Sequence, residues 1–295
     1  MAIETKVMFV QRGQRIDAGK GKDALRQLRT VVLGLAVCLM LGFGGLQSVA
    51  QSAPNFGPNV IIIDPSMSSA TINSTLASLA KLDVNSQFVT SRYAVLFKPG
   101  TYSVQAPIGY YESIAGLGKV PSAVTINGFI TPNFGTVPDN QNLTETFWRS
   151  MENMTFNVET DTTQNAPPNT LQWGVSQGTS LRRLSINGSL QLGDSGSGYS
   201  SGGFIADTEV TGIVSSSTQQ QWFTRNSVLG GWNGSNWNMV FAGVEGAPFS
   251  NYPANAFTVL PTTPVSREKP FLYIDEYGGY RVYVPCNESN SAGVD

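Results

Sequence analysis

The sequence has 295 residues, enough for one large domain with a sizeable core, and only 13% of them are charged. Its net charge is −2 and it contains no histidine, which excludes histidine metal clusters, Ser-His-Asp triads and histidine general bases. Residues 51–295 carry 11 basic and 17 acidic residues, so the sequence lacks the basic character that a nucleic-acid partner requires.

Residues 1–50 are predicted to be an export signal. They hold seven of the 18 basic residues, followed by an apolar run at 31–46 and by small residues before an expected cleavage site after Ala50. A membrane anchor is the alternative, but a run of 16 residues with four glycines is short for a bilayer span. We therefore expect a secreted or periplasmic bacterial protein with no membrane attachment after cleavage.

Cleavage would leave Cys286 as the only cysteine, because Cys38 lies in the signal. No intramolecular disulfide could then form, and stability would come from packing and from backbone hydrogen bonds. Residues 51–60 are predicted to be a linker, and residues 61–295 a single monomeric domain. The sequence suggests no cofactor and no metal site.

The domain is expected to begin with a strand at 61–64 and one amphipathic helix at 69–82. Apolar residues of the helix recur at helical spacing, with Ser and Thr at the polar positions: Ile72, Leu76, Leu79 and Ala80. A single helix before a stack of strands is expected to cover the open N-terminal end of that stack, where the first coil would otherwise expose its core.

A short alternating strand returns several times between residues 147 and 246, usually followed by Gly, Asn or Ser. Spacings of about 30, 26, 18 and 16 residues follow if five positions are equivalent: Met154, Leu184, Val210, Val228 and Val244. Irregular strand-and-turn repeats without helices predict the coils of a β-solenoid. Two further alternating strands, at 270–275 and 280–284, flank a glycine turn and predict a β-hairpin.

The helix and several motifs together resemble the right-handed parallel β-helix, or pectin-lyase-like, superfamily, and more narrowly a group of secreted bacterial β-helix proteins distantly like glycoside hydrolase family 55. The motifs lie at 99–102 (PGTY), 115–119 (AGLGK), 124–128 (VTING), 202–207 (GGFIAD), 219–226 (QQQWFTRN) and 267–273 (REKPFLY).

This resemblance implies an all-β, right-handed parallel β-helix with an N-terminal capping helix and a C-terminal hairpin excursion, and it implies action on polysaccharides. Members of the group are often labelled adenylyl cyclases, a chemistry for which this sequence has no supporting feature. In the resembling proteins a second stretch of β-helix follows, which makes a truncated domain the alternative to a complete one.

Asp207 and Glu209 are the candidate catalytic residues of a hydrolase. Alternation along residues 204–210 places both on the outward side of one strand, about 6–7 Å apart at Cα, where one could act as acid and the other as base or nucleophile. The competing interpretation is structural: Arg183 beside Glu209 and Arg225 beside Asp207 would form ion pairs between coils on a solvated face.

Tryptophans and arginines are the candidate substrate-binding residues. The tryptophans lie at expected strand starts or in Gly/Asn/Ser-rich loops, where a flat ring can stack on a sugar, and the arginines lie on outward positions: Trp148, Trp222, Trp232, Trp237, Arg183 and Arg225. A secreted polysaccharide hydrolase is the leading hypothesis. A polysaccharide lyase with an arginine base and a non-catalytic glycan-binding or surface adhesion module are the alternatives.

Overall fold

The computed structural model describes residues 54–82, 88–132, 143–164, 166–193, 199–254 and 256–294. These residues belong to one unit that comprises residues 53–295, and the predicted export signal lies outside the described residues. Within the described ranges, no helix is both long enough and apolar enough to traverse a bilayer.

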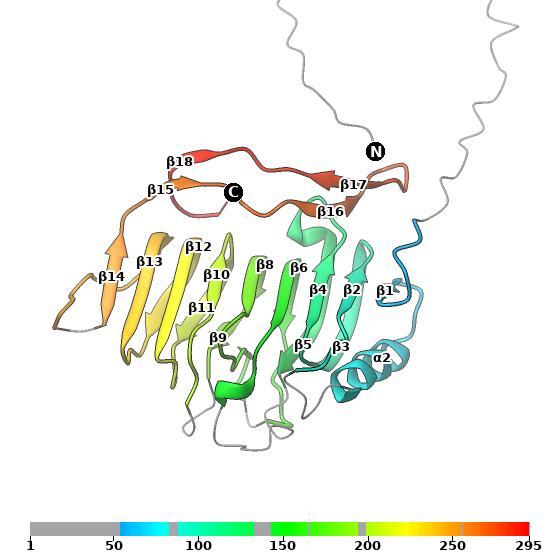
Figure 1. Ribbon diagram of the computed structural model, residues 1–295, viewed down its shortest axis with the longest axis horizontal. Coiled ribbons are helices and arrows are strands. Elements are labelled where there is room, and N and C mark those ends of the chain that lie inside the picture. Colours follow the sequence, from blue (N-terminus) through cyan, green and yellow to red (C-terminus); the bar gives the residue numbers. More distant parts are fainter. Residues whose placement is uncertain are drawn as a thin grey trace, which may run out of the picture. The chain divides into compact units, whose positions relative to one another are not determined.

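Parallel strands stack in successive coils (Figure 1). Each strand of the first sheet pairs in parallel with the corresponding strand of the next coil. In order along the stack, these strands are β1 (Val60–Ile63), β2 (Tyr93–Phe97), β4 (Glu112–Gly116), β6 (Arg149–Val158), β8 (Ser180–Asn187), β10 (Phe204–Ala206), β12 (Gln221–Asn233), β13 (Asn238–Glu245) and β14 (Phe257–Leu260).

The chain of each coil then turns a corner into a second sheet. The later halves of β6, β8 and β12 lie in this sheet with β3 (Gly100–Ile108), β5 (Val124–Pro132) and β11 (Glu209–Ser215). A third run of parallel pairs joins β7 (Thr170–Gln172), β9 (Ser189–Gln191) and the end of β11. Short 3₁₀ helices, η1 (Pro121–Ala123) and η3 (Leu143–Glu145), lie in the connections. Sheets that wind in this way form a parallel β-helix.

Inward side chains of neighbouring coils stack directly on one another, because the strands are paired in register. One such column is fully buried over seven coils: Val95, Ile114, Met151, Leu181, Ile205, Thr224 and Phe241. Burial of this apolar surface, at about 25 cal/mol per Å², is the main source of stability for a chain without disulfides in its described part.

The helix α2 (Ser69–Leu82) occupies the range predicted from its apolar spacing. Ile72 and Leu76 are fully buried, and the helix packs against β3. At its start the Ser68 hydroxyl accepts a hydrogen bond from the Thr71 N–H at 3.2 Å, which satisfies one of the unpaired donors of the first turn.

The expected repeat equivalence is only partly correct. Met154 pairs with Leu184, as predicted, but Val210 pairs with Ile186 and Leu229 instead of Leu184 and Val228. The actual steps between coils are 30, 24, 19 and 17 residues. The alignment fails because each coil turns a corner in mid-repeat, and strict in-out alternation does not continue through a corner.

Residues 261–294, here called the strap, leave the coils as an antiparallel ribbon. Within it β15 (Thr263–Ser266) pairs with β18 (Glu288–Ser291), and β16 (Phe271–Ile274) pairs with β17 (Tyr280–Tyr283). Figure 1 shows the strap lying across one end of the first-sheet strands, from β13 back towards β2. The Ile274 N–H donates to the Leu117 carbonyl at 2.9 Å, which attaches the far end of the strap to an early coil.

Candidate functional site

The corner between the first and second sheets is built from residues in the left-handed conformation. Four polar residues occupy equivalent positions in successive coils, with φ between 43° and 58°: Asn153, Arg183, Asp207 and Asn226. Non-glycine residues rarely adopt positive φ, and Asn and Asp do so most readily. Because the coils stack, these four side chains form one continuous line, here called the corner row.

The strap lies on the corner row and binds to it through side chains. The Asn226 amide donates to the hydroxyls of Ser266 at 3.1 Å and Ser291 at 2.9 Å, and its carbonyl oxygen accepts from Thr263 at 2.7 Å. Asn226 is only 1% exposed, so these bonds satisfy polar groups that would be costly to bury alone.

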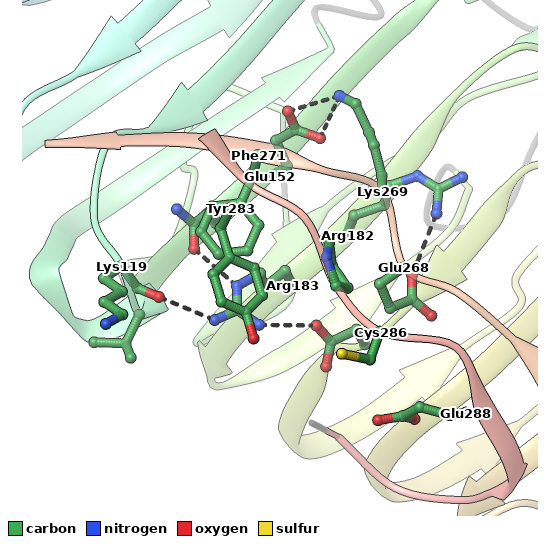
Figure 2. Close-up of a pocket in the computed structure, with 14 residues that line it drawn as sticks. Lys119, Glu152, Arg182, Arg183, Glu268, Lys269, Phe271, Tyr283, Cys286 and Glu288 are labelled. Carbon is green, nitrogen blue, oxygen red and sulfur yellow. Dashed lines mark hydrogen bonds and ion pairs between the residues drawn. The ribbon is translucent and has the colours of Figure 1, made fainter. Parts of the chain in front are cut away.

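A pocket of about 350 Å³ lies between the strap and the corner row (Figure 2). The two strap strands pair at Ser266–Glu288 and again at Phe271–Tyr283, and the pocket lies beneath the segments between these pairs. The coils contribute Glu152, Arg182, Arg183 and Asp207 to its lining, and the strap contributes Glu268, Lys269, Phe271, Tyr283 and Cys286.

Arg183 lies at the centre of the pocket (Figure 2). Its Nη1 is 3.3 Å from Asp207 Oδ2, its Nε donates to Asn153 Oδ1 at 3.2 Å, and its Nη2 donates to the Lys119 carbonyl at 3.1 Å. The Phe271 ring covers the guanidinium, 4.5 Å from its carbon to the ring centroid. These contacts hold the Arg183 side chain in one orientation.

Glu268 bridges two arginines that lie two coils apart. Its carboxylate is bonded to Arg225 Nη2 and lies 3.7 Å from Arg182 Nη1. The coil residue between the two arginines is Ala206, whose small side chain leaves room for the incoming carboxylate. Burial lowers the pKa of Arg182 below its ordinary value, and the charge of Glu268 opposes that shift.

The charges that line the pocket are balanced. Lys269 Nζ donates to both carboxylate oxygens of Glu152 at 2.7 Å, and the lining as a whole contains four cationic and four anionic side chains. Such a site offers many hydrogen bonds without a net charge. In the described part of the chain, no group of three His, Cys, Asp or Glu side chains is placed to hold a metal ion.

The predicted arrangement of Asp207 and Glu209 on one strand face is wrong. The first-sheet strand ends at Ala206, the chain turns at Asp207 with φ 47°, and β11 begins at Glu209. Asp207 is 5% exposed and lines the pocket, whereas Glu209 is exposed on the second sheet, paired with Ser185. The corner therefore sends the two carboxylates to different faces.

The expected ion pairs also differ from the observed ones. Arg183 pairs with Asp207, and Arg225 pairs with Glu268 of the strap. The predicted partnership of Arg183 with Glu209 fails because these coils are offset by 24 residues on both sides of the corner, which pairs Glu209 with Ser185.

Trp148 belongs to a second line of left-handed residues, at the corner where each coil enters the first sheet. This aromatic corner comprises Tyr111, Trp148, Gly178 and Gly202, with φ of 57°, 48°, 73° and 90°. The Tyr111 and Trp148 rings stack 4.9 Å apart and nearly parallel, and the Arg92 guanidinium lies 3.4 Å from the Tyr111 centroid. One face of Trp148 is thus occupied by Tyr111 and unavailable to a sugar.

The three other predicted tryptophans lie in different environments. Trp222 is 3% exposed and packs in the core, so the prediction that it is a sugar platform is wrong in this conformation. Trp232 donates to the Gly234 carbonyl at 2.8 Å and contacts Phe241 edge-on. Trp237 is 66% exposed and presents the freest ring of the four.

Two exposed glutamine side chains, those of Gln177 and Gln221, lie near the glycine end of the aromatic corner. Gln177 donates to the Ser201 hydroxyl at 2.9 Å, and Gln221 approaches the same hydroxyl at 3.5 Å. Both glutamines are exposed, so their remaining donors and acceptors can reach sugar hydroxyls.

Sequence reasoning missed Glu152, Glu268 and Lys269 as pocket residues. Glu152 and Lys269 are 117 residues apart in the chain, and only the path of the strap brings them together. The motif at 267–273, which carried part of the family resemblance, contains Glu268 and Lys269 and was the one available signal.

The fold and its charged corner define a pectin-lyase-like β-helix protein. A family model described as rhamnogalacturonase A/epimerase, pectate lyase-like, matches residues 66–245, and the chain belongs to this family. The match, with the relatives below, confirms the predicted resemblance to the pectin-lyase-like fold and to glycoside hydrolase family 55.

Two comparisons are more specific. The chain is 45% identical over 241 residues to a protein named exo-β-1,3-glucanase from Streptomyces sp. (strain SirexAA-E / ActE). The matched region covers 81% of this chain and 38% of that protein. It resembles the structure of sacteLam55A from Streptomyces sp. SirexAA-E with a TM-score of 0.75 and 44% identity, over 82% of this chain and 42% of that one.

The same values hold for a sacteLam55A variant in complex with glucose. The chain therefore spans about two-fifths of the length of the relatives it matches.

Proposed function

We propose that this chain takes part in the hydrolysis of β-1,3-glucan. The observation that carries the proposal is the 45% identity, over 241 residues, to a protein named exo-β-1,3-glucanase. The charge-balanced pocket and the exposed amides of Gln177 and Gln221 suit a neutral, hydroxyl-rich polymer of this kind.

The proposal includes the organisation of the chain. The coils are right-handed, as parallel strand connections nearly always are, and α2 caps the N-terminal end of the stack. Burial of Ile72 and Leu76 supports the capping role. The β16–β17 hairpin is an excursion from the coils. The protein acts as a monomer after export and cleavage behind Ala50, in the secreted or periplasmic space.

Asp207 and Glu209 remain the proposed catalytic residues, which requires the glucan to pass over the corner that separates their two faces. Asp207 is ion-paired with Arg183 and lines the pocket, whereas Glu209 is exposed at the start of β11. Arg183 positions Asp207, and the glucan contacts Trp148, Trp232, Trp237 and Arg225.

Release of glucose from a linear β-1,3-glucan tests the proposal, with a β-1,4-glucan as the control substrate. We expect glucose from the first only. Asp207→Asn and Glu209→Gln should each lower the rate by about 100-fold or more while thermal unfolding stays cooperative. Glu245→Gln, at another exposed carboxylate, is the matched control and should retain the rate. A folded protein that releases no glucose would refute hydrolysis by this chain.

A non-catalytic glycan-binding module is the second candidate. It is favoured by the ion pairs of the pocket, where Glu152, Asp207 and Glu268 each face a cation. This function predicts retention on an insoluble β-1,3-glucan without turnover, and binding that survives both Asp207→Asn and Glu209→Gln.

A further inference from the structure

Between the Ser266–Glu288 and Phe271–Tyr283 pairs the two strands of the strap are unpaired, and this unpaired part is here called the opening. The sequence itself favours it. Pro270 and Pro285 lie on its two sides, and a proline has no N–H with which to continue a β-ladder. Pairing is present on both sides of the opening, at Ser266–Glu288 and Phe271–Tyr283. Arg267 Nε donates to the Pro285 carbonyl at 3.0 Å, so a side chain replaces the missing ladder contact and fixes the width of the opening.

The floor beneath the opening presents fixed hydrogen-bonding groups. Arg183 directs one N–H each to Asn153, Lys119 and Asp207, and a guanidinium has five N–H groups in total. Asp207 and Glu268 supply carboxylate oxygens that are 4% and 9% exposed on a side-chain basis. Donors and acceptors therefore alternate across a floor that packing and ion pairs keep rigid.

The mouth of the pocket is partly aromatic. Tyr283 is 43% exposed, and its ring stacks on Phe271 with the centroids 5.2 Å apart. Phe271 in turn covers Arg183, so the tyrosine is supported from below. Figure 2 shows Tyr283 above Arg183, with Cys286 beside them on the same strap segment.

Four cations balance four anions in the lining, so an anionic ligand would meet Asp207 and Glu268, and a cationic one would meet the arginines. A neutral hexose has polar edges for the charged floor and an apolar C–H face for an aromatic ring. The volume of about 350 Å³ accommodates one or two such units.

We propose that the pocket beneath the strap opening binds a single neutral hexosyl unit, as free D-glucose or as the end of a glucan. The choice of glucose as the hexose rests on the proposed function. The location of the site and the neutrality of its ligand are inferred from the pocket itself.

Cys286 provides the test because it is exposed and lines the pocket. In a Cys38→Ser background, the rate at which iodoacetamide modifies Cys286 is measured alone, with D-glucose, with a linear β-1,3-gluco-oligosaccharide, and with sodium sulfate. We expect either sugar to slow the modification severalfold and sulfate to leave it unchanged. Protection by glucose identifies the free sugar as a ligand, and protection by the oligosaccharide alone identifies a chain end.

Three tyrosine variants separate binding from structure. Tyr283→Ala should abolish the protection, and Tyr283→Phe, which keeps the ring and its stacking, should restore it. Tyr277→Ala removes an 86% exposed tyrosine from the turn of the same ribbon and should change nothing. Protection by sulfate alone, absence of protection by both sugars, or equal protection in Tyr283→Ala would overturn the proposal.

Glucose release is measured on the same preparations. Protection without release rejects the proposed hydrolysis and keeps the pocket, and release without protection does the reverse.

Discussion

Two corners of the coils, the corner row and the aromatic corner, meet the same backbone demand with different side chains. Both require a left-handed residue in successive coils, and both place those residues in line. The corner row uses Asn153, Arg183, Asp207 and Asn226. The aromatic corner uses Tyr111 and Trp148 in two coils and glycine in the next two.

The difference shows that the same repeated backbone position can serve two structural roles, depending on the side chain it carries. In the corner row, buried polar side chains bind the strap, and the ion pairs with Glu268 and Lys269 extend that attachment. At the aromatic corner, the positive φ of a bulky residue costs about 1–2 kcal/mol, which stacking at about 0.5–1.5 kcal/mol offsets in part. One corner anchors a distant segment, and the other stabilises itself locally.

Glu268→Gln should give the largest effect on this comparison. The change keeps the shape of the side chain but leaves Arg182 and Arg225 against an uncharged group in a site that is largely buried. We expect a loss of about 3 kcal/mol in the free energy of unfolding, measured by urea denaturation.

Glu276→Gln, at an exposed carboxylate in the β16–β17 turn, is the control and should be nearly neutral. Equal effects of the two changes would mean that the ion pairs of Glu268 contribute little to holding the strap, and that part of the contrast between the corners would fail.

Gly178→Ala tests the aromatic corner. A Cβ at this position would lie 2.6 Å from Trp148 Cδ1, whereas a Cβ at Gly278, also at positive φ, would meet nothing within 4 Å. Both changes carry the strain of a left-handed alanine, and only Gly178→Ala adds a clash with the ring. We expect it to cost about 1–2 kcal/mol more than Gly278→Ala in urea denaturation, with a change in tryptophan fluorescence. Matching losses would show that Trp148 moves aside freely and that its stack on Tyr111 contributes little.

Local pattern predicted the parts of the fold that local physics determines. The apolar spacing of residues 69–82 predicted α2, and the pairing of Met154 with Leu184 followed from alternation within a straight strand. Alternation gave the wrong faces at Asp207 and Glu209 because aspartate accepts both extended and left-handed backbones, so the sequence contains no mark of the corner.

The pocket could not be predicted from local sequence patterns for a different reason. Its ion pairs join residues such as Glu152 and Lys269, and no pattern within either segment specifies the other. Trp222 illustrates the same limit: a tryptophan at a strand start has the same sequence signature whether its ring fills the core or faces solvent.

Asp64 offers the smallest and most selective test, because its ion pair lies in the first coils, outside the corner row. Ile63 pairs with Phe97, so Asp64 and Lys98 follow at the next position, and their side chains form an exposed ion pair at 2.8 Å. The hydrogen bond from Lys98, with further bonds from the N–H and hydroxyl of Ser66, lowers the pKa of Asp64 well below its ordinary range.

A depressed carboxyl pKa stabilises the folded state at pH values above the ordinary pKa of about 4, and this contribution is lost as the pH falls through the lower folded-state pKa. Asp64→Asn should therefore lower the melting temperature slightly at pH 7, and its difference from the unmodified protein should shrink as the pH falls below about 4. Thermal melts at pH 7, 4 and 3 measure this, with Glu276→Gln as the exposed control. A difference that does not vary with pH would assign the effect of Asp64 to its hydrogen bonds with Ser66 and not to its charge. Ion pairs would then stabilise the fold chiefly where the strap buries them, as at Glu268.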